Sequence, residues 1–290
     1  MSYLVFSVFC SVAVSVLLKL SPRLRLDVGQ MVMWNYLMAA GLCFALLRPS
    51  LDSLRGGQGP WLTLSMLALL LPSVFLILAK AVAGNGIVRT DVAQRLSLLL
   101  SLLAAFVWFG ERADVWKLTG LALGLIAIVG VVARPETMSG SRSDGSWRWL
   151  LLVWAGFAAI DVMLKQVAQS GTSSMSALQV IFVMAFLLML CRQIWRHGLG
   201  YEPLRLCNFP AGLLLGLFNF GNIFFYVRAH QALPENPATV FASMNIGVVV
   251  LGTLVGVVVF GEKTSQYNRL AIVLAIAAIV LIQVGLSRPG

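Results

Sequence analysis

Ten long apolar runs, separated by short polar connections, take up nearly all of the 290 residues. A helix needs about 20 apolar residues to cross ~30 Å of hydrocarbon, and each run is close to that length. The runs do not alternate polar and apolar residues at every second position, so they predict helices and not barrel strands. The predicted spans are 3–20, 30–47, 60–83, 87–109, 115–132, 147–168, 174–190, 209–232, 237–260 and 267–286.

The composition indicates that lipid is the solvent. Hydrophobic residues make up 59% of the chain and charged residues 11%, against roughly 45–50% and about 25% in soluble domains. Most basic residues behind the net charge of +10 flank the apolar runs, which suits lipid head groups better than nucleic acid. The four cysteines have neither metal nor disulfide spacing, and we expect free thiols. The predicted fold class is an all-α integral membrane protein with ten transmembrane helices.

The chain contains an internal repeat. Phe-Gly-Glu followed by a basic residue ends the fourth span at 109–112 and the ninth span at 260–263. Lys19 and Lys165 end the first span of each half, and basic residues recur at matching places in the third spans. Together with the small-residue-rich run after each Phe-Gly-Glu turn, these are four landmarks in the same order, which indicates duplication.

The longest polar stretch divides the two copies. It predicts a first five-helix repeat at 1–135, a linker at 136–146 and a second five-helix repeat at 147–290. Because five is odd, the second repeat must enter the membrane in the opposite direction. Such inverted repeats recur among secondary transporters, whose site lies near the bilayer midplane between the halves.

These motifs, in this order, resemble the drug/metabolite transporter superfamily and in particular its ten-helix EamA-type transporters. The resemblance rests on 95–112 and 243–263, each the end of a long helix closing in Gly-Glu-basic, and on Lys19 and Lys165. It implies a secondary transporter that exports a small metabolite by alternating access from the bacterial cytoplasmic membrane. The implied partners are a small-molecule substrate and membrane lipids, with a monomer or homodimer, no nucleic acid and no cofactor.

The first repeat, less one helix, also resembles the four-helix small multidrug resistance exporters. Those proteins use a membrane-embedded glutamate about two turns before the first-helix lysine to exchange protons for cationic drugs. The corresponding positions here are Ser11 and Phe157, neither of which is a carboxylate. We therefore do not expect that mechanism in this chain.

Charged residues inside spans are candidates for function, because each costs several kcal/mol near the bilayer centre. Arg95 lies in the fourth span with Gln94 beside it and Asp91 one turn earlier, on a shared face where the charges can pair. Asp161 and Lys165 repeat this spacing in the sixth span. The pairs either exchange partners with substrate or proton, or form permanent salt bridges, and both interpretations stay open.

Uncharged polar residues and basic groups near helix ends complete the predicted binding set. Polar side chains in spans must face protein or a wet cavity. Interhelical hydrogen bonds, an interfacial aromatic belt and snorkelling lysines or arginines are the structural alternatives. These further candidates are Trp34, Asn35, Tyr36, Lys80, Asn219, Asn222, Tyr226, Arg228 and Asn245.

Two smaller motifs point to packing. Glycine pairs four residues apart at 120/124, 212/216 and 252/256 predict close contact between the halves rather than dimerisation. Glu111 and Glu262, in the two Gly-Glu-basic turns, are expected to serve the fold.

The excess of basic over acidic groups in or near the spans favours an anionic or zwitterionic substrate, such as an amino acid or a carboxylate. The alternative function is a lipid or lipid-linked-sugar translocase, in which basic groups would hold a phosphate. No catalytic or metal-ligand constellation occurs, so we do not expect an enzyme.

The orientation in the membrane follows from the basic residues in the connections between spans. The first, third, fifth, seventh and ninth connections hold eleven basic residues, and the other side holds five. By the positive-inside rule this count places both termini outside the cytoplasm, whereas the resemblance implies cytoplasmic termini. Orientation stays open.

Overall fold

The computed structural model describes residues 2–50, 59–108, 114–132, 146–201, 203–233, 237–262 and 265–287. Within these ranges the regular elements are helices. In chain order they are α1 (Ser2–Leu20), α2 (Val28–Leu42) with its π-helical continuation η1 (Cys43–Leu47), α4 (Trp61–Asn85), α5 (Ile87–Arg95), α6 (Ser97–Trp108), α7 (Val115–Val132), α8 (Ser146–Gln169), α9 (Ser174–Gly198), α10 (Asn208–Ala232), α11 (Pro237–Val258) and α12 (Gln266–Ser287). The predicted linker lies outside the described residues except for its last one.

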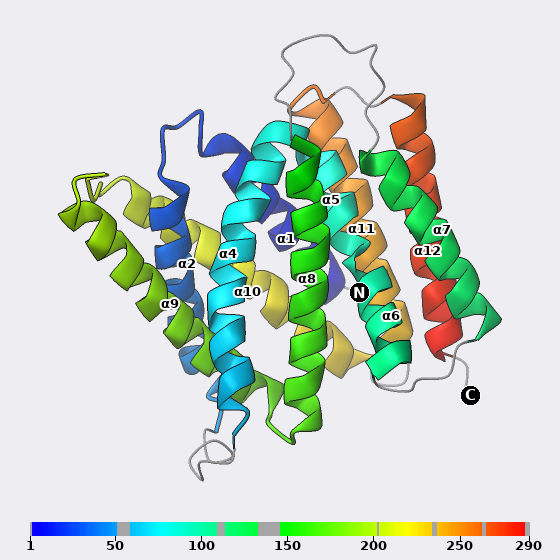
Figure 1. Cartoon of the computed structure of the whole chain (residues 1–290), viewed down its shortest axis with the longest axis horizontal. Helices are drawn as coiled ribbons and strands as arrows, with labels where there is room; N and C mark the ends of the chain where they lie inside the picture. The colour runs from blue at the N-terminus through cyan, green and yellow to red at the C-terminus, as the bar shows by residue number, and fades with distance from the viewer. Residues whose placement is uncertain are drawn as a thin grey trace.

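The predicted membrane spans are confirmed. Among the described residues, eight helical segments are long and apolar enough to cross a membrane, and α7 is a shorter apolar helix. The remaining span is made of two short helices, α5 and α6, placed end to end. Figure 1 shows the ten spans as a bundle in which successive spans run in opposite directions.

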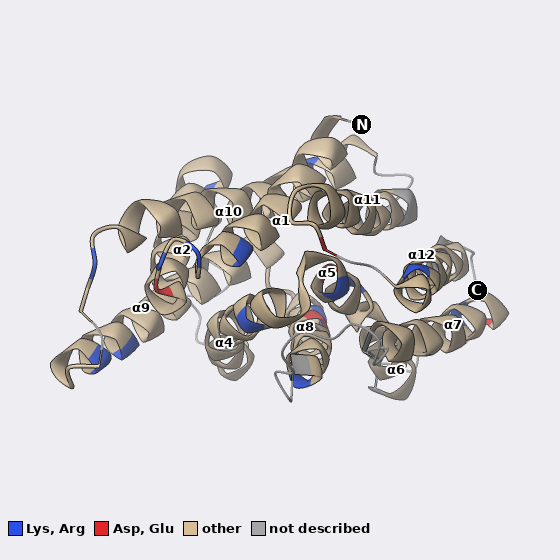
Figure 2. Ribbon diagram, turned by 90° about the horizontal axis from the view of Figure 1, so that it is seen from above, with Lys and Arg blue, Asp and Glu red and all other residues tan. Residues whose placement is uncertain are grey.

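Contacts between the two halves come in matched pairs. α1 packs on α10 as α8 packs on α4, and α1 packs on α11 as α8 packs on α6. α2 packs against α9, the helix at the same place in the second half, and α7 packs in the same way against α12. These pairs are what two inverted five-helix units produce when a two-fold axis in the membrane plane relates them. Looking down the helices, Figure 2 shows α5 in the middle, between α1 and α11 on one side and α8 on the other.

Close packing of glycines joins the halves, as the sequence predicts. A Cβ added at Gly216 of α10 would lie 2.6 Å from the backbone oxygen of Asn35 in α2. A Cβ at Gly212, one turn earlier, would lie 2.8 Å from the backbone oxygen of Met31. Since real Cβ atoms do not approach so closely, only glycine lets α2 and α10 come together here.

The fourth span differs from its prediction, because the single run expected over 87–109 is interrupted at Leu96. The interruption contains neither proline nor glycine. Instead, the indole Nε1–H of Trp154, in α8, donates a 2.8 Å hydrogen bond to the Leu96 carbonyl. A donor that inserts into the helix ladder is a recognised cause of a kink. The same carbonyl also accepts a 3.0 Å hydrogen bond from the Leu99 N–H, so the indole is its second donor.

Replacing Trp154 with phenylalanine should lower the thermal unfolding midpoint of the purified protein. A phenyl ring would fill most of the same space, but the Leu96 carbonyl would lose one of its two donors, at a cost of ~0.5–1.5 kcal/mol. Trp147→Phe is the matched control, because that ring lies at the start of α8 and is 46% exposed. Equal midpoints for the two variants would mean that the indole bond does not stabilise the break.

Candidate functional site

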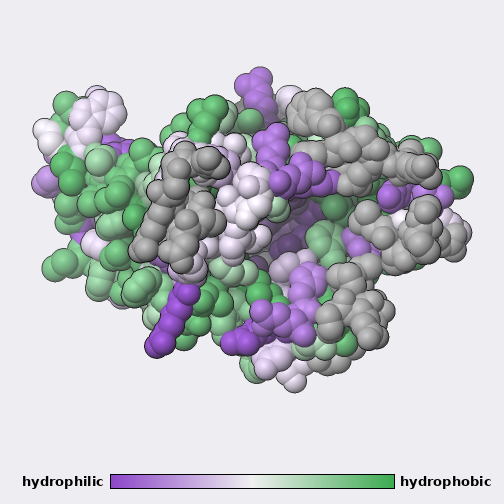
Figure 3. Space-filling view, turned by 90° about the horizontal axis from the view of Figure 1, so that it is seen from below, coloured by the Kyte–Doolittle hydropathy of each residue, from purple (hydrophilic) through white to green (hydrophobic). Residues whose placement is uncertain are grey.

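A polar cavity of about 170 Å³ lies between the repeats, where α5 gives way to α6. It lies toward the end of the bundle at which α8 and α10 end and α11 begins. Figure 3 views this end and shows a hollow near the middle of the molecule with hydrophilic atoms inside it. The lining residues are Gln94, Arg95, Ser97, Leu98, Phe157, Asp161, Asn222, Tyr226, Phe241, Met244 and Asn245.

Arg95, the last residue of α5, supplies the positive charge of the cavity. One guanidinium nitrogen, Nη2, donates to the hydroxyl of Ser11 at 2.7 Å, and Nη1 donates to Oδ1 of Asn245 at 3.4 Å. The Nε–H is buried and has no hydrogen-bond partner among the residues that the structure describes. Because a guanidinium has five N–H donors, Arg95 keeps hydrogen-bonding capacity for an acceptor that enters the cavity.

Asp91 lies one turn before Arg95, behind the cavity. Its side chain is almost fully buried. One carboxylate oxygen accepts a 2.8 Å hydrogen bond from the Ser15 hydroxyl, and the other has no partner. Asp91 and Arg95 therefore do not pair directly, because each binds a different serine of α1.

Asp161 supplies a negative charge on the α8 side of the same cavity. Its Oδ2 accepts hydrogen bonds from the hydroxyls of Ser101 at 3.2 Å and Ser97 at 3.5 Å, both on α6. Lys165, one turn later on α8, is not part of the lining. The cavity thus brings an arginine of the first repeat and an aspartate of the second repeat into one polar space.

Predicted polar residues of α10 and α11 complete the lining. Asn222 is held against α1, since its amide donates to the Ser7 carbonyl at 3.0 Å while the Ser7 hydroxyl donates to the Asn222 carbonyl at the same distance. The Asn245 amide donates to the Phe241 carbonyl at 2.9 Å, which turns its oxygen toward Arg95. These bonds fix the orientation of two cavity amides before any ligand binds.

The predicted cluster in α2 lies elsewhere: Trp34 and Asn35 are at the contact of α2 with α10, and Tyr36 packs against Phe75 of α4 and Phe182 of α9. The Trp34 ring packs edge-on against Phe209, with ring centroids 4.8 Å apart. Asn35 is fully buried and accepts a 3.1 Å hydrogen bond from the Asn219 amide. Tyr36 is also fully buried among aromatic rings. Trp34, Asn35, Tyr36 and Asn219 thus lie at contacts between helices and outside the lining of the cavity.

The two basic candidates near helix ends also lie outside the cavity. The Lys80 ammonium lies over the Trp149 ring, 4.6 Å from its centroid. Arg228 is exposed, lies over the Phe224 ring and donates to the Gln231 side chain at 3.4 Å. Both are satisfied by neighbours on the outer surface of the bundle.

Sequence reasoning missed the serines that hold the charged residues. Ser11 and Ser15 bind Arg95 and Asp91, and Ser97 and Ser101 bind Asp161. One signal was available: Ser11 and Phe157, which occupy the positions of the exporters' membrane-embedded glutamate, both reach this site. Ser11 binds Arg95, and Phe157 lines the cavity.

Comparisons with known proteins agree with this architecture. A model of the EamA-like transporter family matches residues 1–133. An uncharacterized protein of Haemophilus influenzae is 39% identical, with 96% of each chain covered. A crystal structure of another protein, 17% identical, has a TM-score of 0.56 over 97% of this chain and 96% of its own, which indicates a shared fold. This chain belongs to the EamA-like transporter family and is a multi-pass membrane transporter of small molecules.

Proposed function

We propose that the protein exports a small zwitterionic or anionic metabolite by alternating access, with the central cavity as its binding site. The observation that carries the proposal is Arg95, whose buried Nε–H has no partner, facing the same polar space as Asp161. An arginine fork suits a carboxylate, since charge-assisted hydrogen bonds are about twice as strong as neutral ones. The outward direction follows from the family resemblance.

The size and lining of the cavity favour a solute of amino-acid size. One water needs roughly 10–15 Å³ of such space, so about 170 Å³ has room for about ten non-hydrogen atoms. Arg95 can bind a carboxylate, and Asp161 can bind an ammonium group. Phe157, Phe241 and Met244 offer an apolar surface to a side chain.

The discontinuous fourth span supports alternating access. Binding sites of inverted-repeat transporters are typically built at broken helices, whose free ends meet the substrate. Here the break at Leu96 directly follows Arg95. A substrate carboxylate bound to the guanidinium would add a negative charge near Asp91 and Asp161, which couples binding to the charge balance of the site. One chain contains the whole cavity, so a monomer in the bacterial cytoplasmic membrane would suffice.

The test is a substrate screen on the purified protein. Thermal stabilisation is measured with amino acids, organic anions, nucleobases, cationic dyes and short-chain phospholipids, and hits are tested for transport in proteoliposomes loaded from either side. A stabilising zwitterion or anion that is transported supports the proposal. Stabilisation by cationic dyes or phospholipids alone would overturn it.

Replacing Asp161 with asparagine should weaken a zwitterion at least about tenfold, because its ammonium group loses a charged acceptor worth ~1.5 kcal/mol or more. A simple carboxylate of equal size should bind as well or better, since a repelling charge is gone. Isothermal titration with both ligands measures the difference. Asp114→Asn is the control, because this carboxylate lies at the start of α7, outside the cavity lining. Equal weakening of both ligands by Asp161→Asn would contradict the assignment of Asp161 to the ammonium group.

A further inference from the structure

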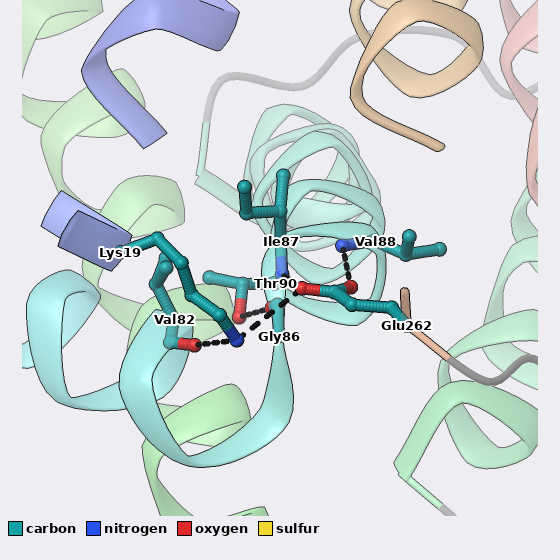
Figure 4. A network of polar contacts seen from close by, with 7 residues as sticks. All are labelled: Lys19, Val82, Gly86, Ile87, Val88, Thr90 and Glu262. Carbon is teal, nitrogen blue, oxygen red and sulfur yellow. Dashed lines mark hydrogen bonds and ion pairs between the residues drawn. The ribbon is translucent and has the colours of Figure 1, made fainter. Parts of the chain in front are cut away.

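A charged contact lies at the opposite end of the bundle from the cavity opening. Glu262, just beyond α11, accepts hydrogen bonds from the backbone N–H groups of Ile87 at 2.7 Å and Val88 at 3.1 Å, the first two residues of α5. The ammonium of Lys19, at the end of α1, lies 3.3 Å from the same carboxylate and donates to the Val82 carbonyl at 3.3 Å. Figure 4 shows these groups converging on the turn between α4 and α5.

The chemistry of this contact is that of a strong, specific link. A carboxylate at a helix N-terminus binds free N–H groups and is favoured by the helix dipole, and a cation is favoured at the last carbonyls of a helix. The exposed fractions of the Lys19 and Glu262 side chains are only 18% and 14%, so solvent weakens the pair less than at an open surface. Lys19 therefore binds Glu262 instead of extending to the lipid head groups.

The link joins the two repeats. Glu262 belongs to the second repeat, and the groups that it binds belong to the first. Below it, glycines of α11 make room for side chains of α5: a Cβ at Gly256 would lie 2.6 Å from the Val88 side chain and 3.0 Å from the Glu262 carboxylate, and one at Gly252 would overlap the Asp91 carboxylate. The polar cavity begins on the far side of this contact, at Arg95.

We propose that Glu262 and Lys19 hold the transport pathway closed at this end of the bundle, and that their contact breaks each time the site opens there. The proposal rests on transport by alternating access through the central cavity. For the cavity to open at this end, α5 must separate from α11. Because Glu262 spans these two elements, that separation must release the N-terminus of α5 from the carboxylate.

The first test measures accessibility and needs no substrate. Val88 is 2% exposed beneath Glu262, so Val88→Cys reports opening when Cys10, Cys43 and Cys191 are replaced by alanine. Cys207 is exposed and precedes α10 at the same end, and it is kept to identify vesicles that present this end to the reagent. Labelling by a membrane-impermeant maleimide is measured at each cysteine by peptide mass spectrometry.

In this background, Glu262→Gln should raise the labelling rate of the reporter about tenfold, the change in population that ~1.4 kcal/mol produces. Lys19→Met should act in the same direction. Asp27→Asn is the matched control: the Asp27 carboxylate also accepts a hydrogen bond from a helix-start amide, that of Gln30 at 2.6 Å, but at α2. Equal reporter labelling in Glu262→Gln, Asp27→Asn and the parent would overturn the proposal.

A second variant keeps the proposal testable if Glu262→Gln does not fold. Arg23→Cys and Phe260→Cys, which leave Lys19 and Glu262 in place, are combined and joined by a short bis-maleimide, because the Arg23 guanidinium lies over the Phe260 ring, 5.6 Å from its centroid, at the same end of the bundle. The linked protein should lose transport, while each single-cysteine variant, treated alike, should keep it. Transport at the unlinked rate through the linked protein would overturn the closure. Failure of all transport in the parent, with the labelling pattern as expected, would instead count against the proposed function.

Discussion

Replacing Arg95 with alanine is expected to reduce transport by about a hundredfold or more. The guanidinium binds Ser11 and Asn245 and presents an unpartnered Nε–H among groups that line the cavity. Its loss would remove the group that holds the substrate carboxylate and would leave two aspartates without a nearby cation. Losing one partner of a buried charge network costs ~3–5 kcal/mol, and ~3 kcal/mol is already about a hundredfold.

Two variants separate this effect from general damage. Arg95→Lys keeps the charge without the planar fork, so it should bind substrate weakly but fold normally. Arg228→Ala removes an arginine that lies outside the cavity, and it should transport at the parental rate. Initial rates in proteoliposomes, normalised to folded protein by size-exclusion chromatography, give the comparison. Full activity of well-folded Arg95→Ala would remove Arg95 from the mechanism.

Replacing Gly216 with valine is expected to prevent assembly of the bundle. The added Cβ would lie 2.6 Å from both the backbone oxygen of Asn35 and the Cβ of Met38. Because backbone atoms cannot move aside as a flexible side chain can, α2 and α10 would have to separate. That separation would also expose the buried Asn35–Asn219 hydrogen bond. The expected result is loss of the monodisperse peak in detergent.

Gly41→Val provides the control for this substitution. Gly41 lies on α2 as well, but a Cβ there would meet nothing within 4 Å. Its variant should elute as the parent does and unfold at a similar temperature. If Gly216→Val also behaved like the parent, the close approach of α2 and α10 would not be required for the fold.

The sequence predicted the spans because their signal is local. A run of about 20 apolar residues has few options in lipid other than a helix. The break at Leu96 could not be predicted in the same way, because nothing in the fourth span itself requires it. The group that binds the Leu96 carbonyl from outside the span is the Trp154 indole, which belongs to the other repeat and meets Leu96 only in the folded bundle.

The candidate site was partly predictable for a related reason. The cost of burying polar groups in hydrocarbon correctly indicated that Arg95, Asp161 and Asn222 face protein. The same cost applies to Asn35 and Asn219, and the Asn219 amide donates to the Asn35 side-chain oxygen at the α2–α10 contact, away from the cavity. Periodicity identifies residues that avoid lipid, but it does not identify which polar neighbour they meet.

The shortness of α5 has a mechanical consequence. Its nine residues form a rigid rod only about 13 Å long at 1.5 Å per residue, with Glu262 bound at one tip and Arg95 at the other. A rod this short cannot bend appreciably, so a tilt imposed at one tip is transmitted undiminished to the other. The interruption after Arg95 would let this rod turn about Leu96 as one body. Under the proposed mechanism, substrate binding at Arg95 and closure at Glu262 would therefore influence each other through the tilt of α5, with no relay of side chains between them.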